Sequence, residues 1–239
     1  MITHDISQNH ILAALPAKDR ERILQDLKLV KMTPSQTVFQ AGLDLRHVYF
    51  PTTAIVSLLI EIEDGSSQEV AMVGNEGVVG VSLFMGGEQT VSRAVVQSSG
   101  YAYQFSGMLL KSEFHRGSFM QHLLLSYTFA LLTEIAQTLV CNRHHSKDQQ
   151  FCRWLLLRFD RLPSNSLAIT QEQIANLLGV RRNAISEISI NLQKAGLIKH
   201  SRGRIALLNW PGLEKRVCEC YAVIKKRLDH LSKLSIQAE

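Results

Sequence analysis

The sequence lacks an uninterrupted apolar run of the ~18 residues that a membrane-spanning helix needs. Its most apolar stretch, residues 123–140, is broken by polar side chains that include Thr133 and Glu134. The first ten residues are polar and show no basic segment followed by an apolar one, so a signal peptide is not expected. We therefore predict a soluble cytoplasmic protein with no membrane partner.

Cysteine is scarce, with 4 residues in a chain of 239, which excludes a disulfide framework. Cys218 and Cys220 have the spacing of half a metal site, but the other half is missing from the sequence around them. On the single helix predicted for this segment, side chains two positions apart point in different directions. We therefore predict isolated thiols, with no metal site and no resident cofactor.

Motifs that signal catalysis are missing too. The sequence contains no Gly-rich phosphate loop, no Ser-His-Asp order and no His and Cys set at ligand spacing. An enzyme is therefore not expected.

Acidic residues are few in the C-terminal part of the chain. From Lys147 onward the chain holds 16 of its 26 Lys and Arg residues but 8 of its 21 Asp and Glu residues, a net charge of +8. The first 146 residues hold the other 10 basic and 13 acidic residues, a net charge of −3. This asymmetry indicates a polyanion partner for the C-terminal part, although a solvated basic surface would give the same count.

Apolar periodicity divides the chain into a helical start, a β-rich part and a helical remainder. Residues 9–30 carry apolar side chains at helical spacing and predict one or two short helices. Short β-branched runs separated by turn residues follow, as is typical of an antiparallel sandwich or barrel. The predicted strands are 37–39, 48–50, 55–62, 69–73, 78–83, 94–97 and 101–105.

Residues 118–142 contain no Gly or Pro and predict one long helix with apolar residues on more than one face. One apolar face of this helix can cover the β-rich part, and the apolar residues on its other faces need a second partner. That partner is either the same helix of a second subunit, which we favour, or another part of the same chain. The residues predicted for a dimer interface are Phe119, Leu123, Phe129, Leu132, Ala136 and Val140.

After a predicted helix over 148–160, the stretch 171–195 predicts two helices joined at Gly179. Thr170 suits the N-cap of the first helix. Gly179 supplies a turn that another residue would adopt only with strain, and Ala175 is small where the two helices would cross. The second helix exposes polar side chains suited to phosphate and base contacts.

A basic turn at 202–204, between two short apolar runs, predicts a small hairpin after these helices. Pro211 stands near the start of a last helix that is predicted to run without a break to Leu234.

This order of β-rich part, long helix, helix-turn-helix and basic hairpin resembles the Crp/Fnr superfamily of bacterial transcription regulators. The resemblance covers nearly the whole chain and is strongest over ITQEQIANLLGVRRNAISEISINLQKAGLI and SRGRIALLNWPGLEKRVCECY. The second stretch is similar to a subgroup without an assigned ligand. The resemblance implies an α+β fold with an N-terminal cyclic-nucleotide-binding-like β-roll (a double-stranded β-helix), a long dimerisation helix and a C-terminal winged helix-turn-helix. The implied domains are residues 1–117, 118–145 and 146–239.

The resemblance further implies a homodimer that binds double-stranded DNA at a palindromic operator and works with RNA polymerase. It places Arg182, Asn183 and Glu187 toward the bases, where they would suit guanine, adenine and the amino group of cytosine. An ion pair of Glu187 with a neighbouring Arg of the same helix is the open alternative. The full predicted DNA-binding set is Thr170, Gln171, Arg181, Arg182, Asn183, Ser186, Glu187, Arg202 and Arg204.

Members of the superfamily that bind a cyclic nucleotide hold its ribose with a Glu after a Gly, and its phosphate with an Arg two residues before an Ala. Here Val81 follows Gly80, and Ser92 stands where that Arg would be, with Arg93 one position late. A one-residue slip on a strand points a side chain to the opposite face, and a phosphate without its Arg loses a charge-assisted contact. Cyclic nucleotide binding is therefore not expected, unless Glu76 replaces the missing carboxylate. The candidate ligand-binding residues are Glu76, Gly80, Val81, Ser92 and Arg93.

The sequence does not identify the effector. Iron–sulfur sensing in the superfamily needs cysteines near the N-terminus, and the first cysteine here is Cys141. His144 and His145 could sense pH or a metal, but neighbours on a helix splay by about 100°, so a shared metal is not expected. The β-roll then senses an unidentified signal or is degenerate. The alternative function is a protein-interaction module built on the β-roll as a scaffold.

Overall fold

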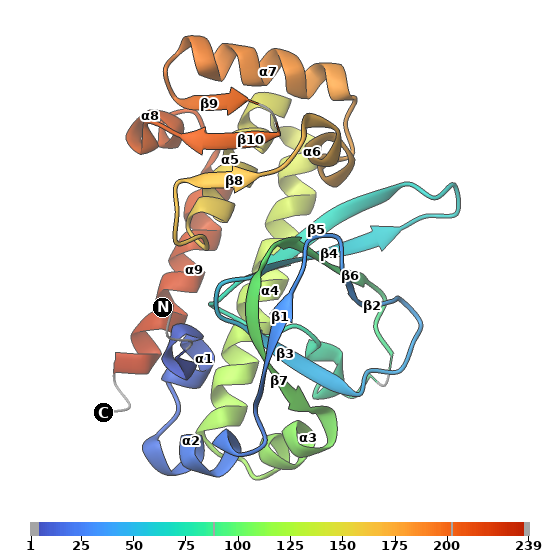
Figure 1. The fold of residues 1–239 in the computed structure, drawn as a ribbon, viewed down its shortest axis with the longest axis vertical. Coiled ribbons are helices and arrows are strands. Elements are labelled where there is room, and N and C mark those ends of the chain that lie inside the picture. Colours follow the sequence, from blue (N-terminus) through green and yellow to red (C-terminus); the bar gives the residue numbers. More distant parts are fainter. Residues whose placement is uncertain (1–4, 88, 202, 237–239) are drawn as a thin grey trace.

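The computed structural model describes residues 5–87, 89–201 and 203–236, and it shows the predicted α+β architecture (Figure 1). A 3-10 turn, Ile6–Gln8, precedes helices α1 (His10–Ala13) and α2 (Ala17–Leu24). Asn9 caps α1, and its buried amide donates hydrogen bonds to the carbonyls of Pro51 and Gly77, both at 2.9 Å. These bonds fix the start of the chain on the β-rich part.

Antiparallel strands form two sheets in the β-rich part, in the orders β1-β7-β3 and β2-β6-β4-β5. Together they make the predicted β-roll. The strands are β1 (Lys28–Met32), β2 (Thr37–Phe39), β3 (His47–Pro51), β4 (Ile55–Glu61), β5 (Ser67–Val73), β6 (Arg93–Ser98) and β7 (Gly100–Ser106).

Two of the expectations for this part are wrong. The helix expected up to Val30 ends at Leu24, because residues 28–32 pair along β7 and become a strand through this distant partner. The strand expected at 78–83 is absent from the described β-roll. Gly80 turns the chain there with φ 109°, and Val81–Leu83 forms a 3-10 turn.

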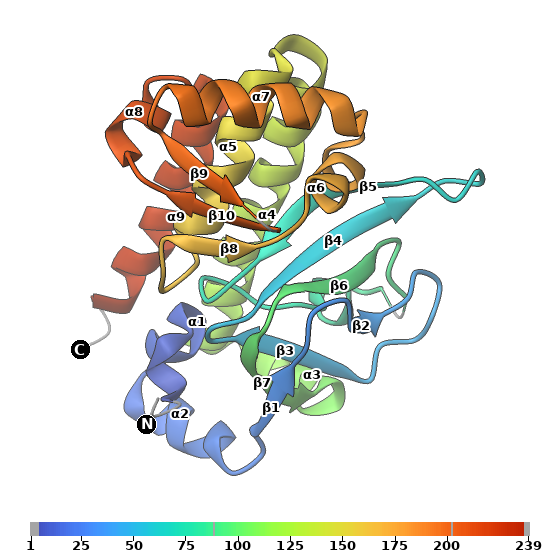
Figure 2. The same ribbon diagram turned by 45° about the horizontal axis from the view of Figure 1, so that its top comes forward.

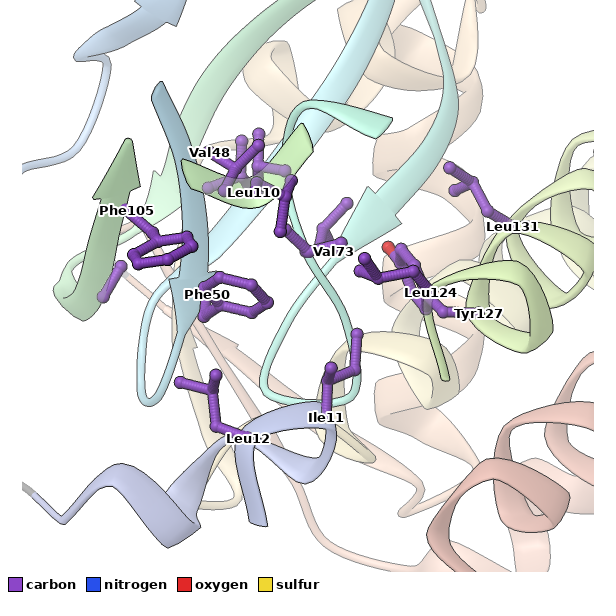
Figure 3. Close-up of a cluster of buried hydrophobic side chains, with 14 of the residues drawn as sticks. Ile11, Leu12, Val48, Phe50, Val73, Phe105, Leu110, Leu124, Tyr127 and Leu131 are labelled. Carbon is purple, nitrogen blue, oxygen red and sulfur yellow. The ribbon is translucent and has the colours of Figure 1, made fainter. Parts of the chain in front are cut away.

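The core of the β-roll is apolar and includes side chains from the helices beside it. In Figure 3, Phe50 and Phe105 of the sheet, Leu12 of α1 and Leu124 of the long helix point toward one another. Each of them is less than 2% exposed. At about 1.5–3 kcal/mol for each buried side chain of this size, such packing holds the long helix firmly on the sheet.

Helix α3 (Gly107–His115) leads into the long helix α4 (Phe119–His144), which runs beside both the β-roll and the last helix, α9 (Glu219–Ile236) (Figures 1 and 2). By length and composition α4 is apolar enough to cross a membrane. Its inner face is nevertheless buried in the protein, with Leu123, Leu124 and Tyr127 among the buried residues. The β-roll and α9 thus account for one part of the apolar surface of α4.

The C-terminal part consists of helices around a small antiparallel sheet of order β8-β10-β9. Its elements are α5 (Lys147–Phe159), β8 (Ser166–Ala168), α6 (Gln171–Leu178), α7 (Arg182–Lys194), β9 (Ile198–Ser201), β10 (Arg204–Leu207), α8 (Trp210–Glu214) and α9. The predicted hairpin is present, and β8 adds a third strand to it. The single helix expected from Pro211 to Leu234 is instead two helices, interrupted over 215–218.

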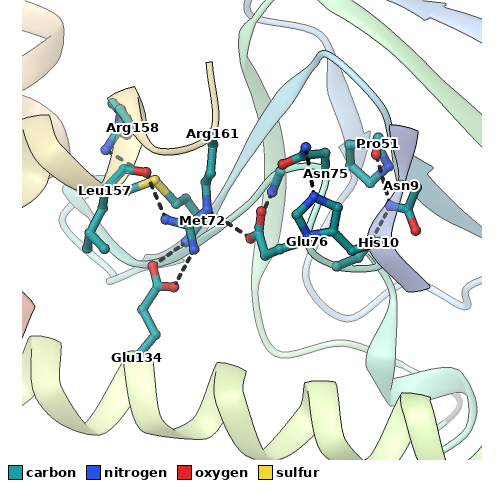
Figure 4. A network of polar contacts seen from close by, with 12 residues as sticks. Asn9, His10, Pro51, Met72, Asn75, Glu76, Glu134, Leu157, Arg158 and Arg161 are labelled. Carbon is teal, nitrogen blue, oxygen red and sulfur yellow. Dashed lines mark hydrogen bonds and ion pairs between the residues drawn. The ribbon is translucent and has the colours of Figure 1, made fainter. Parts of the chain in front are cut away.

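A buried ion network joins the three parts of the fold (Figure 4). Arg161, which follows α5, contacts the carboxylates of Glu76 in the β-roll and Glu134 in α4, each at 2.8 Å. One turn earlier, Arg158 contacts Glu69 of β5 at 2.5 Å and lies over the Trp154 ring. Burial opposes charge on Arg161, but the two carboxylates outweigh it and raise the pKa of the guanidinium. The network therefore fixes α5, and the helices after it, relative to the β-roll.

Candidate functional site

The two helices joined at Gly179 have the geometry of a helix-turn-helix. Thr170 caps α6 and forms a reciprocal capping box with Gln173, as its sequence position predicts. Gly179 adopts the left-handed conformation, with φ 63°, that ends α6. Ala175 is buried where α6 and α7 meet, and its carbonyl accepts a hydrogen bond from the Val180 amide at 2.9 Å.

Helix α7 lies on the outer surface of the C-terminal part (Figure 2). Its apolar face, with Ile185, Ile188 and Leu192, is buried in the core of this part. Arg181, Arg182, Asn183 and Glu187 are exposed, whereas Ser186 is half-buried and donates a hydrogen bond to Gln171 at 2.6 Å. The predicted polar face is therefore open to a partner at Arg181, Arg182, Asn183 and Glu187, whereas Ser186 is bonded to Gln171 at the start of α6.

The N-terminal end of α7 strengthens the positive field of this face. Arg181 is the N-cap residue, no side chain caps the helix, and its first turn contains no acidic residue. The positive end of the helix dipole and the two arginines therefore point to the same patch of surface, an arrangement that favours a phosphate.

The β9–β10 hairpin stands beside this helix as a wing. A polar recess of about 390 Å³ lies between them, and Thr170, Gln171 and Arg182 are among its lining residues, with His200 from β9. Arg204 is exposed on β10 and donates a hydrogen bond to Ser166 at 3.2 Å. Arg202, also predicted to bind DNA, lies outside the described residues. The structure thus brings most of the predicted set onto one surface.

The β-roll contains a cavity of about 450 Å³ between its strands and α4. Gly80, Val81 and Ser92 line it, together with Leu131 and Ile135 of α4. The other lining residues are Phe39, Leu58, Ile60, Val70, Val78, Ser82, Met85, Gly87, Gln89, Thr90 and Val91. None of the described lining residues carries a charge, so this wall suits an apolar, uncharged ligand.

Two of the candidate ligand-binding residues are not among the residues that line the cavity. Glu76 is 4% exposed. Its carboxylate forms an ion pair with Arg161 and accepts a hydrogen bond from the Gly74 amide. Arg93 pairs with Glu61 at 3.1 Å. Neither side chain is in place to contact a ligand in the cavity.

An apolar stripe runs along the outer face of α4. Phe129 and Leu132 are each 52% exposed and Leu139 is 73% exposed, so this face is largely open, although Arg227 of α9 lies over the Phe129 ring at 4.4 Å. The complete stripe is Leu125, Phe129, Leu132, Ala136, Leu139 and Val140. Two of the predicted interface residues differ from it. Phe119 is half-buried, and Leu123 is 2% exposed because it packs in the β-roll core, so the assignment of Leu123 to an interface is wrong.

The cysteines at the end of the chain are not isolated thiols, contrary to the prediction. Cys218 lies in the break between α8 and α9, and with Cys220 it contacts Cys141 and His145 from the end of α4. The expectation failed because it assumed one unbroken helix through Cys218. The Cys141 thiol beside it lowers the pKa of Cys218. No signal in the local sequence could have placed Cys141, which is 77 positions away.

Comparison with known proteins identifies the C-terminal part directly. Residues 149–216 match the family model described as the Crp-like helix-turn-helix domain. This span contains most of α5, both helices of the helix-turn-helix, the wing sheet and α8. None of the curated proteins matches the chain by sequence.

Solved structures match the fold at low sequence identity. FixK2 from Bradyrhizobium japonicum is 16% identical, with a TM-score of 0.67 over 80% of this chain and 98% of its own. A transcriptional regulator of the CRP family from Thermus thermophilus is 16% identical, with a TM-score of 0.66 over 78% of this chain and 95% of its own. The c-di-GMP responsive global regulator CLP of Xanthomonas campestris is 17% identical, with a TM-score of 0.61 over 81% of this chain and 99% of its own. The resemblance to the Crp/Fnr superfamily is therefore confirmed: the chain carries a Crp-like helix-turn-helix domain on a Crp/Fnr fold.

Proposed function

We propose that this Crp/Fnr-type regulator is a homodimer that binds a palindromic operator through α7 and controls transcription by RNA polymerase in the cytoplasm. The observation that carries the proposal is the exposed trio of Arg182, Asn183 and Glu187 on a helix whose other face is buried. Residues 1–117 would serve as the sensor, 118–145 as the dimerisation helix and 146–239 as the DNA-binding domain.

The apolar stripe of α4 supports the dimer. Its residues Leu125, Phe129, Leu132, Ala136 and Leu139 follow one another at alternating spacings of four and three. This is the heptad pattern of a two-helix seam, and the structure leaves it exposed on one side of the protomer. The same stripe in a second copy would cover it with the two-fold symmetry that a palindrome requires.

Glu187 has a role in base readout in this proposal. No ion pair of the described residues joins Glu187 to Arg181 or Arg182, so the carboxylate is free to accept from the amino group of cytosine. Arg182 would read guanine and Asn183 adenine. Two such helices would read half-sites about one helical turn, near 34 Å, apart.

We expect Arg182→Ala and Arg204→Ala to weaken DNA binding in different ways. Arg182→Ala should cost about 1–3 kcal/mol at the preferred operator and remove the preference for one base pair, because it removes a base contact. Arg204→Ala should weaken binding to all sequences alike and lower the salt slope by about 1, because it removes a phosphate contact. Fluorescence anisotropy with the DNA upstream of the protein's own gene, at two salt concentrations, measures both effects.

The matched control is Arg116→Ala, which removes the same charge from the exposed end of α3, far from α7. It should leave both the base preference and the salt slope unchanged. If Arg204→Ala removed base preference and Arg182→Ala did not, the two roles would be exchanged. Binding without any sequence preference would favour the protein-interaction module instead.

We expect neither cyclic AMP nor cyclic GMP to bind the β-roll. The wall of the cavity offers no charged group among its described residues, and Arg93 is engaged by Glu61 outside it. A cyclic phosphate would therefore lose its hydration without a charged partner. Isothermal titration should show no saturable heat up to about 1 mM ligand, a binding free energy of about 4 kcal/mol or less. Micromolar binding would contradict the prediction that the β-roll binds no cyclic nucleotide. It would make Glu76 and Arg93 candidate ligand-binding residues again.

A further inference from the structure

Three cysteines and a histidine from distant parts of the chain meet at one point beside the DNA-binding domain. Cys141 lies in the last turn of α4, and His145 caps that helix. Cys218 and Cys220 flank Glu219, the first residue of α9. The three Sγ atoms and a ring nitrogen of His145 all lie within 4.8 Å of one another. All three cysteines are buried and free of disulfides.

We propose that these four residues bind one Zn²⁺ ion, with Cys141, Cys218 and Cys220 as thiolate ligands and His145 as the nitrogen ligand. Thiolate and imidazole are the ligands that zinc prefers in closed structural sites. A tetrahedral zinc with bonds of about 2.3 Å to sulfur and about 2.05 Å to nitrogen holds two sulfurs about 3.8 Å apart, and a sulfur and a nitrogen about 3.6 Å apart. The Sγ atoms of Cys141 and Cys218 are 3.6 Å apart, and Cys220 Sγ is 3.6 Å from His145 Nδ1.

The groups around the four ligands support a metal rather than a chance contact of thiols. His145 Nδ1 faces the sulfurs, and its Nε2 lies 3.2 Å from a carboxylate oxygen of Glu219. A carboxylate that orients the second nitrogen is the usual partner of a zinc-bound histidine. Gln150 is buried and donates hydrogen bonds to the carbonyls of Cys141 and His145, which holds the end of α4 in place.

The charges around the four ligands are also compatible with a bound Zn²⁺ ion. Three thiolates and a neutral imidazole around Zn²⁺ carry a net charge of −1, which is costly inside a protein unless a cation lies near. Arg153 of α5 is buried, its Nε has no hydrogen-bond partner among the described residues, and its charge acts on both Cys141 and Cys220. The guanidinium offsets the negative charge of the site.

Two other uses of the same residues fit less well. A disulfide between Cys141 and Cys218 would need the sulfurs at about 2.05 Å and would leave Cys220 and His145 without a role. An iron–sulfur cluster spreads its ligands over several irons, whereas these four atoms are all close enough to share one centre. A single ion uses all four.

A zinc at this point would join the end of the dimerisation helix to the start of α9. Cys141 and Cys218 are 77 positions apart, and the chain between them contains the helix-turn-helix and the wing. Closing so long a segment with one ion limits the freedom of the unfolded chain and holds both ends of the DNA-binding domain together. The site would be a structural metal site, and it is separate from the cavity of the β-roll.

The test is the metal content of the full-length protein purified without added chelator, measured by inductively coupled plasma mass spectrometry. We expect about one zinc per chain in the wild type, as for a four-ligand site, and almost none in Cys218→Ser or Cys220→Ser. Cys152→Ser is the matched control, since Cys152 is also buried but lies outside the cluster. It should keep its zinc. A wild type that neither contains zinc nor takes it up on titration overturns the proposal, as does a Cys141–Cys218 disulfide, bound iron or a Cys218→Ser protein that keeps its zinc.

A second variant avoids the risk that loss of a ligand unfolds the protein. Glu219 is exposed on the surface of α9, so Glu219→Gln should fold normally and weaken zinc affinity by about 10- to 100-fold through His145. Competition with a coloured chelator measures the shift. Cobalt exchanged into the wild type should show the charge-transfer and visible bands of a tetrahedral thiolate site. An unchanged affinity in Glu219→Gln, or an octahedral cobalt spectrum, would count against the site as described.

Discussion

Replacing Leu132 with glutamate is expected to convert the protein into a monomer with little affinity for its operator. Leu132 lies in the middle of the exposed stripe of α4, and in the proposed dimer the heptad spacing sets it against the same residue of the second copy. Two carboxylates would then face each other in an apolar seam, where both would lose hydration and repel each other. Sedimentation velocity should show a single species with the mass of one chain.

DNA binding should fall with the loss of the dimer. Specific dimers bind their operators at about 10⁻⁸–10⁻¹¹ M, and a single recognition helix makes about half of those contacts, so we expect a loss of about 10,000-fold or more. Met108→Glu is the control, because Met108 is 82% exposed on α3 and lies outside the stripe. It should leave both the mass and the affinity unchanged. A Leu132→Glu protein that remains dimeric would place the interface on another surface.

The helix-turn-helix was predictable because its signals are local. Thr170 and Gln173 cap α6 within one turn, and Gly179 supplies the left-handed residue at the junction. The apolar residues of α7 repeat at helical spacing and define the buried face by themselves. Each of these features lies within a few positions of the structure that it determines, so the sequence was sufficient for this part of the site.

The features that the sequence missed depend on distant partners. Strand β1 exists because it pairs with β7, about 70 positions later in the chain. The thiol cluster depends on a break over 215–218, which turns Cys218 out of the helix and toward α4. No rule of spacing relates Cys218 to Cys141. The heptad stripe could be predicted only in part. Its spacing can be read from the local sequence, but only the fold shows that Leu123 faces the core while Leu125 faces outward.

Helix α4 connects the separate elements of the proposed function. Its outer face carries the stripe, its inner face closes the β-roll cavity with Leu131 and Ile135, and Glu134 enters the buried ion network. Its last turn supplies Cys141 and leads to His145. A ligand that displaces α4 at the cavity would therefore act on the same element that, in the proposed dimer, sets the spacing of the two recognition helices.

The second large effect is expected from Arg161→Met, which should lower the free energy of unfolding by about 3–5 kcal/mol. Arg161 is the only described residue that forms ion pairs with both Glu76 and Glu134, and all three side chains are almost completely buried. Without the guanidinium, two carboxylates would lie close together in a medium of low dielectric constant. Burial already raises the pKa of Glu134 in the intact network. Urea unfolding followed by circular dichroism measures the change.

Two further variants separate the buried charge from the loss of packing. Lys225→Ala breaks an ion pair with Asp160 that is partly exposed, and it should cost only about 0–1 kcal/mol. Arg161→Met combined with Glu134→Gln should be more stable than Arg161→Met alone, because one of the two unpaired carboxylates is gone. Equal stabilities of the single and double variants would mean that packing of the Arg161 side chain, rather than charge, holds α5 against the β-roll. In that case the orientation of the helix-turn-helix would depend on the apolar contacts of Trp154 and Leu157 in α5, and a change of charge at Glu76 would leave DNA binding unaffected.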